Sequence, residues 1–247
     1  MKLFFFQCAC VALLWTASPV VYAVTTPTVQ LRADVDLTSD PLKGAAYLQS
    51  VVAELPEPNA SIIRMVLEYP TDGTHTYWWP RAGEGSYDGS TTDVLVNGAL
   101  AMKGESEQRT FCCGLTLEVY YRYLNGRPDL REKLSQDQYS EFKKDWFCRE
   151  IFSPGPEDAL RNFKLGVKIT DLNAARPGDF VQLWRNNKSG HSVIFVNWIA
   201  DAHGNKLGFR YWSTQKSSNG IGYQSEYFGD EPRAVDEKHL SIARAAY

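Results

Sequence analysis

A cysteine at the expected start of a helix and a histidine at the expected start of a strand are the residues most suited to chemistry. Cys112 lies in the first turn of a segment, residues 110–124, whose apolar spacing and following Asn125-Gly126 predict a helix. A thiol at a helix N-terminus faces the positive end of the macrodipole, which stabilises a thiolate nucleophile. His191 follows a Ser-Gly turn and opens a strand, so its imidazole is expected at a sheet rim. The pair predicts nucleophilic catalysis by a thiol with imidazole as its base.

The same helix start offers donors for the oxyanion that forms when a carbonyl is attacked. We expect the backbone N–H groups of Cys112 and Cys113 to point toward it, and Gln108 precedes them closely enough to lend a side-chain donor. Free cysteines are commonly small buried core residues, so a purely structural role for both thiols stays open.

A catalytic histidine needs a third polar group to hold its tautomer. Antiparallel pairing across the turn at 201–206 brings Gln215 and Ser213 near His191, and we place Gln215 first because its side chain is longer. Asn197 shares the face of the histidine, but six residues of strand separate them by about 20 Å. It is therefore excluded as the orienting residue.

The remaining chain predicts an α+β protein. Asp40-Pro41 begins a helix that extends to Glu54, and residues 61–69 are expected to be extended. Residues 70–110 are expected to form long loops with short strands, followed after the cysteine helix by further helical pieces within 128–163. Three strands then form an antiparallel meander over 180–184, 191–198 and 207–214.

The N-terminus has the pattern of a secretion signal over residues 1–23. Lys2 is followed by an apolar run, and Val21-Tyr22-Ala23 supplies small residues at the two positions that a signal peptidase reads. Thr16-Ala17-Ser18-Pro19 stops the run before the roughly 20 residues that a membrane anchor needs. We expect a secreted or periplasmic protein with one domain over 24–247 and no stable membrane insertion after cleavage.

Loss of the signal leaves an odd number of cysteines. Cys8 and Cys10 depart with it, so Cys112, Cys113 and Cys148 remain. In an oxidising compartment at least one of them is free or paired between chains. A bond between Cys113 and Cys148 would leave one free thiol, whereas a vicinal bond between Cys112 and Cys113 would be strained.

Composition argues against several other classes of protein. The 247 residues are 44% hydrophobic and 22% charged, which is typical of a folded protein and not of a disordered one. The formal net charge of −3 gives no field that would attract the chain to a phosphate backbone, so nucleic acid is not an expected partner.

Residues 72–80 hold a second group of interest. Trp78 and Trp79 are candidate substrate-binding residues because aromatic rings stack on sugar faces, although tryptophan is also a core residue. His75, Asp88 and Asp93 lack the spacing of a metal motif, so no metal or other cofactor is expected.

Three short segments carry a family resemblance. Cys112-Cys113-Gly114-Leu115 resembles the Cys-Ser-Gly-Leu motif of NlpC/P60 cysteine peptidases. Residues 176–181 and 190–195 resemble their Pro-Gly-Asp and Gly-His strands, in the family's order. The resemblance implies a papain-like fold, in which the nucleophile at a helix N-terminus packs on an antiparallel sheet. It also implies Cys112 as the nucleophile and hydrolysis of amide bonds, commonly in bacterial cell-wall peptides.

Two departures from that family are visible. The interval between Cys112 and His191 is longer than the family's, which leaves room for inserted helices, and Phe111 stands where an acidic residue is usual. CHAP-type amidases, which have the same order, are equally possible relatives.

The sequence therefore predicts an exported cysteine hydrolase that cleaves amide bonds in peptides or glycopeptides, with peptidoglycan as one such substrate. A transglutaminase-like acyl transferase uses the same order of cysteine and histidine and stays open. A noncatalytic glycan- or peptide-binding module on the same fold is the third alternative.

Overall fold

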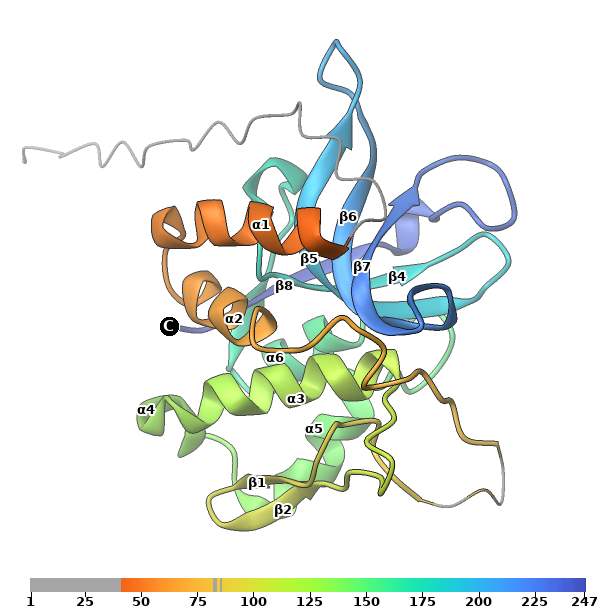
Figure 1. Cartoon of the computed structure of the whole chain (residues 1–247). Helices are drawn as coiled ribbons and strands as arrows, with labels where there is room; N and C mark the ends of the chain where they lie inside the picture. The colour runs from red at the N-terminus through yellow and green to blue at the C-terminus, as the bar shows by residue number, and fades with distance from the viewer. Residues whose placement is uncertain (1–40, 82–83, 85) are drawn as a thin grey trace, which may run out of the picture. The chain divides into compact units, whose positions relative to one another are not determined.

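The computed structural model describes residues 41–81, 84 and 86–247 (Figure 1). The signal sequence expected at residues 1–23, with its cleavage site, lies outside the described residues.

Six α-helices occur in the described part of the chain, and all of them precede the main sheet in sequence. Their bounds are α1 Pro41–Val51, α2 Asn59–Val66, α3 Cys112–Asn125, α4 Pro128–Arg131, α5 Tyr139–Trp146 and α6 Pro156–Asn162. A 3-10 turn, Val52–Glu54, continues α1 to the end expected for it. Among these helices, none has both the length and the apolar character needed to cross a bilayer.

The extended segment expected at 61–69 is wrong, because helix α2 spans most of it. Ile62, Ile63 and Val66 are all buried, with helical spacing toward the core. A short apolar run fits either a buried strand or a buried helix, and its period alone does not distinguish them. The neighbours decide here, since α2 packs against α3.

A six-stranded antiparallel sheet forms the second half of the fold, in the order β3-β8-β4-β5-β6-β7. Its strands are β3 Gly166–Lys168, β4 Phe180–Trp184, β5 Gly190–Ala200, β6 Lys206–Gln215, β7 Gly220–Tyr227 and β8 Ser241–Ala245. A separate hairpin, β1 Val94–Val96 and β2 Ala99–Met102, lies in the long loop region. The α+β class and the meander through β4, β5 and β6 are confirmed.

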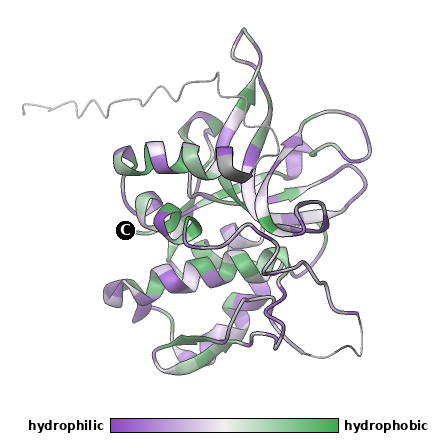
Figure 2. Cartoon of the chain, viewed as in Figure 1, coloured by the Kyte–Doolittle hydropathy of each residue, from purple (hydrophilic) through white to green (hydrophobic). Residues whose placement is uncertain are grey.

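Helix α3 is the element that joins the two halves. It contacts α2, α5, β5 and β6, and all but two of its residues are buried. Aromatic rings fix it in place: Tyr120 lies 5.2 Å from Trp146, and Trp146 lies 4.9 Å from Phe180 of β4. Hydrophobic residues follow α3 and the central strands, while polar residues gather at the turns (Figure 2). This packing holds the first turn of α3 against the sheet.

Candidate active site

Cys112 is the first residue of α3, which begins two residues later than the sequence predicts. The preceding residue, Phe111, has extended backbone, and its N–H donates to the Gly89 carbonyl at 3.3 Å. The first turn contains no acidic side chain, so nothing there opposes a negative charge on sulfur. The N-terminal N–H groups of this 14-residue helix supply the positive end of its dipole.

The loop before α3 approaches its first turn very closely. A Cβ atom at Gly114 would lie 2.0 Å from the Asp88 carbonyl oxygen and 2.6 Å from Gly89 Cα. Only glycine fits this contact, so close packing against the loop explains why glycine follows the two cysteines.

His191 and Gln215 are brought together from neighbouring strands. His191 Nε2 lies 2.8 Å from Gln215 Oε1, and the Tyr211 hydroxyl donates to the same oxygen at 3.0 Å. Because an amide oxygen only accepts, Nε2 carries the hydrogen and the lone pair of the neutral ring is on Nδ1. The free nitrogen is thus available as a base.

The register of β5 and β6 explains this contact. Ile194 pairs with Trp212 and Phe195 with Tyr211, and the same register continued places Gln215 opposite His191. An irregularity between Phe195 and Asn197 shifts the pairing by one residue toward the turn. This irregularity is a β-bulge, and Gln215 lies opposite His191 only because of it.

The environment of Cys112 favours its thiolate. A hydrogen bond from the Cys113 thiol holds the pKa of Cys112 well below its usual range, although burial opposes this shift. The charge of the His191 imidazole and its hydrogen bond to the Cys112 side chain lower that pKa further. A hydrogen bond from the Ser192 backbone lowers the pKa of Cys112 as well. Burial raises the pKa of Cys113 well above its usual range, so the two neighbouring thiols are chemically different.

The other residues proposed for this site lie elsewhere. Ser213 is buried, and its hydroxyl donates to the Ser192 carbonyl at 2.8 Å, so it supports the strand and does not touch the imidazole. Gln108 is exposed, and its carbonyl oxygen lies 3.1 Å from His75 Nδ1. It does not line the cleft described below. Asn197 bonds the Trp198 carbonyl at 3.2 Å, away from the histidine.

A cleft of about 980 Å³ opens over the histidine. His191 and Gln215 line it together with both tryptophans of the 72–80 segment. Trp78 is stacked on Tyr87 at 5.2 Å and has the Arg109 guanidinium 3.8 Å from its ring centre. The Trp78 ring therefore packs against other residues of the protein.

Trp79 differs, because 54% of it is exposed and its ring lies at a tilt 4.7 Å from Phe111. Of the two tryptophans, it is the one with a ring face available to a bound molecule. His191, 7% exposed, lines this cleft, and Cys112, 8% exposed, lies behind it as the hydrogen-bond partner of the imidazole and is not itself a lining residue.

The residues weighed for a metal site are dispersed among other partners. Asp88 accepts from the Lys143 ammonium at 2.7 Å, and Asp93 accepts from the Gly104 N–H at 2.9 Å. No group of three His, Cys, Asp or Glu suited to a metal occurs among the described residues. The remaining cysteines, Cys113 and Cys148, are both free thiols in this structure.

Two further groups near the histidine were missed in the sequence. The Tyr211 ring contacts the imidazole edge-on at 5.4 Å, and its hydroxyl lies 3.5 Å from Glu226, which forms an ion pair with Arg185. Tyr211 is four residues before Gln215 on β6, so the two-residue period of a strand places both on one face. That spacing was a usable signal. The sequence carried no such signal for the ion pair, because Arg185 follows β4 and Glu226 lies far along the chain on β7.

Comparison of the chain with protein-family models, with curated proteins and with solved structures finds no match. The residues and their geometry therefore carry the functional argument alone.

Proposed function

We propose that this protein is an exported thiol hydrolase that cleaves amide bonds. The observation that carries the proposal is the chain of contacts from Gln215 through His191 to Cys112 at the start of α3. A thiolate at a helix N-terminus, a histidine with one nitrogen free, and an amide that fixes the other nitrogen make the set needed for nucleophilic catalysis.

In the reaction we propose, His191 Nδ1 takes the proton of the Cys112 thiol and the sulfur attacks the amide carbonyl carbon. The oxyanion accepts hydrogen bonds from N–H groups at the start of α3. The imidazolium then protonates the leaving amine, and a thioester on Cys112 remains. Water, deprotonated by His191, hydrolyses this thioester and releases the acid.

The sequence resemblance to NlpC/P60 and CHAP-type enzymes supports a papain-like assignment for this proposal. Cysteine helix and histidine strand occur in that order, and helices α4, α5 and α6 occupy the long interval between them. Peptides or glycopeptides, including cell-wall peptides, are the substrate class we propose. The expected cleavage site places the mature N-terminus at Val24, which N-terminal sequencing of exported protein checks.

An activated ester tests the reaction class even while the natural substrate is unidentified. With p-nitrophenyl acetate, wild-type protein is expected to release nitrophenolate and to carry an acetyl group on the peptide containing Cys112, as measured by mass spectrometry. Cys112→Ala should lose both signals, and His191→Ala should slow both. The matched control, Cys148→Ala, should keep them.

Acetylation of all three thiols at similar rates, or unchanged turnover by Cys112→Ala, would overturn the proposal. Adding a primary amine separates hydrolysis from acyl transfer, because a transferase would form the acetylated amine in place of acetate. Binding of a peptide or glycan with no thioester formed on Cys112 would favour the noncatalytic module.

A further inference from the structure

The cleft over His191 has a charge opposite to that of the whole protein. Four cationic side chains and two carboxylates line it, giving a net charge of +2 in a chain of net charge −3. The cations come from four separate segments and converge on one surface: Arg81, Arg185, Lys216 and Arg233.

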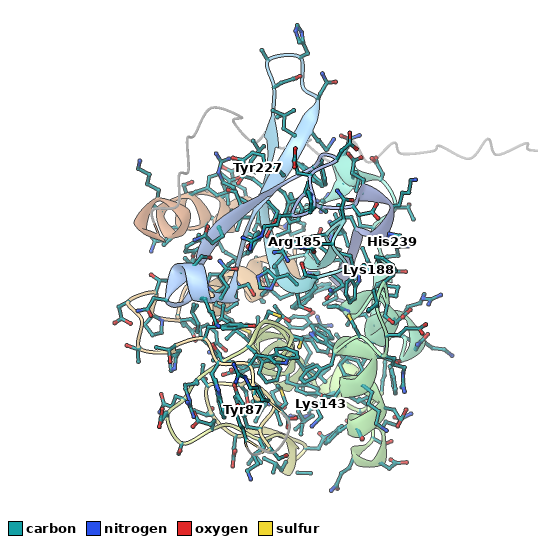
Figure 3. All side chains as sticks on the ribbon, turned by 90° about the vertical axis from the view of Figure 1, so that its right-hand side faces the viewer. Tyr87, Lys143, Arg185, Lys188, Tyr227 and His239 are labelled. Carbon is teal, nitrogen blue, oxygen red and sulfur yellow. The ribbon has the colours of Figure 1, made fainter. Side chains whose placement is uncertain are left out.

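One of these cations, Arg185, is ion-paired, and a second, Arg81, has a carboxylate hydrogen-bonded to its backbone. Arg185 donates from two nitrogens to Glu226, and the side chains are only 19% and 13% exposed. Glu84 accepts a hydrogen bond at 2.8 Å from the backbone N–H of Arg81, which places its carboxylate next to that residue. Figure 3 shows Arg185 in the strand half of the molecule, above the half that contains Tyr87.

Lys216 and Arg233 account for the remaining positive charge. Both side chains are exposed, and neither has an ion-pair partner among the residues that the structure describes. Two unbalanced cations in one concave site attract anions more strongly than the same charges on an open surface.

The backbone holds both cations close to the proposed catalytic pair. Lys216 directly follows Gln215, whose side chain bonds His191. The loop with Arg233 is fastened to the turn that precedes β5: the Pro232 and Ala234 carbonyls accept hydrogen bonds at 2.8 and 3.1 Å from this turn, at Asn187 and Asn186. The backbones of Lys216 and Arg233 are therefore held near the histidine, and their side chains reach the cleft from there.

We propose that this cleft selects an acidic peptide, with carboxylates close to the bond presented to Cys112 that are bound by Lys216 and Arg233. This inference rests on the proposed function in one respect only, which is that Cys112 attacks a bond of the bound peptide. Recognition of the carboxylates depends on the two cations and on the shape of the cleft.

Binding is measured first, separately from turnover. The probes are two fluorescein-labelled hexapeptides that differ only in having two glutamates or two glutamines at the centre. The protein is the full chain with Cys112→Ala, which prevents cleavage, and fluorescence anisotropy gives the dissociation constants. We expect the glutamate peptide to bind about tenfold tighter at about 20 mM salt, and the preference to shrink at about 300 mM.

The double variant Lys216→Gln/Arg233→Gln should abolish that preference. Its matched control is Lys43→Gln/Lys133→Gln, which removes the same charge from two exposed lysines that do not line the cleft. The reversal Lys216→Glu/Arg233→Glu should favour a peptide with two central lysines. Circular dichroism confirms that each variant is folded.

Equal binding of the two peptides, or an equal loss of preference in both double variants, would overturn the inference. Cleavage assays with intact Cys112 distinguish the two proposals. Cleavage of both peptides with equal efficiency leaves the hydrolase standing and removes the acidic selectivity. A charge preference in binding, together with no thioester on Cys112, leaves the anion site standing and removes the hydrolase.

Discussion

Cys112 and Cys148 are free thiols at opposite ends of two helices, and their surroundings give them opposite properties. Cys112 begins α3, beside the imidazole of His191. Cys148 comes two residues after α5 ends, in a left-handed backbone conformation with φ of +63°. Its thiol donates to the Ser153 carbonyl at 3.5 Å.

The pKa values of Cys112 and Cys148 therefore shift in opposite directions. Burial raises the pKa of Cys148 to about 12, and the neighbouring charges of Cys112 and Asp158 act in the same direction. A helix C-terminus also disfavours an anion. Both thiols are largely shielded from solvent, so burial alone does not separate the nucleophile from the inert thiol: Cys112 differs from Cys148 in the hydrogen bond from Cys113, in its contact with His191 and in its place at a helix N-terminus.

The largest expected difference between the two thiols is the loss of turnover when Cys112 or its base is removed. Cys112→Ala and His191→Ala should each reduce kcat/KM for an amide substrate by at least about 10³-fold, because nucleophile and base act as one unit. The double variant should be hardly worse than either single one. Rates are measured with a cleavable peptide. If the losses in activation free energy add up in the double variant, Cys112 and His191 do not act as one unit.

A smaller but direct test compares alkylation rates across pH. The lowered pKa of Cys112 keeps its thiolate populated below the range of an ordinary cysteine, so its reaction with iodoacetamide should rise less steeply between about pH 6 and 9 than that of Cys148. Cys148 stays far below its pKa of about 12 throughout, so its rate should rise about tenfold per pH unit. Near neutral pH the ratio should exceed about 10².

Peptide mapping by mass spectrometry assigns each rate to its residue. His191→Ala removes one charge and one hydrogen bond that lower the pKa of Cys112, so the Cys112 rate should rise more steeply with pH in that variant than in wild-type protein. Parallel pH profiles for Cys112 and Cys148 in wild-type protein would refute the difference between the two helix ends.

The third effect concerns the residue that holds the imidazole. Gln215→Ala leaves the thiol in place but frees the ring, so kcat should fall about 10- to 100-fold with KM little changed. The comparison variant is Ser213→Ala, on the same strand face, whose hydroxyl bonds a backbone carbonyl and not the ring. It should keep kcat within a few-fold, and an equal loss in both variants would mean that strand integrity, not ring orientation, is measured.

Much of this arrangement was predictable from local signals. The stop at Asn125-Gly126 and the apolar spacing before it locate the helix of Cys112, and the β-branched runs locate the strand of His191. Turn position brought Gln215 and Ser213 near His191, and the longer side chain of Gln215 placed it first. These features depend on residues close in sequence.

The misassigned and missed parts depend on contacts between distant segments. The sequence predicts an extended segment where helix α2 lies, because a short apolar pattern fits both structures and only packing against α3 decides between them. The cleft cations Lys216 and Arg233 lie in separate loops, whose convergence follows from hydrogen bonds between the 228–235 loop and the turn before β5. A contact between such distant segments leaves no hydrophobic periodicity in the local sequence, so the sequence does not predict it.

The smallest expected effect is that of Cys148→Ala, which tests the inert side of the comparison. The thiol makes one long hydrogen bond and a contact with the Gly155 region, where a Cβ would come within 2.9 Å of its sulfur. Its removal should lower the free energy of unfolding by about 1 kcal/mol, because a largely buried group and a weak bond are lost. Turnover should stay within about twofold, since a thiol with a pKa of about 12 supplies no nucleophile at neutral pH. Urea unfolding and the cleavage assay measure the two quantities. A loss of turnover as large as that of Cys112→Ala, in protein that is still folded, would show that the two helix ends act together and that Cys148 belongs to the catalytic machinery.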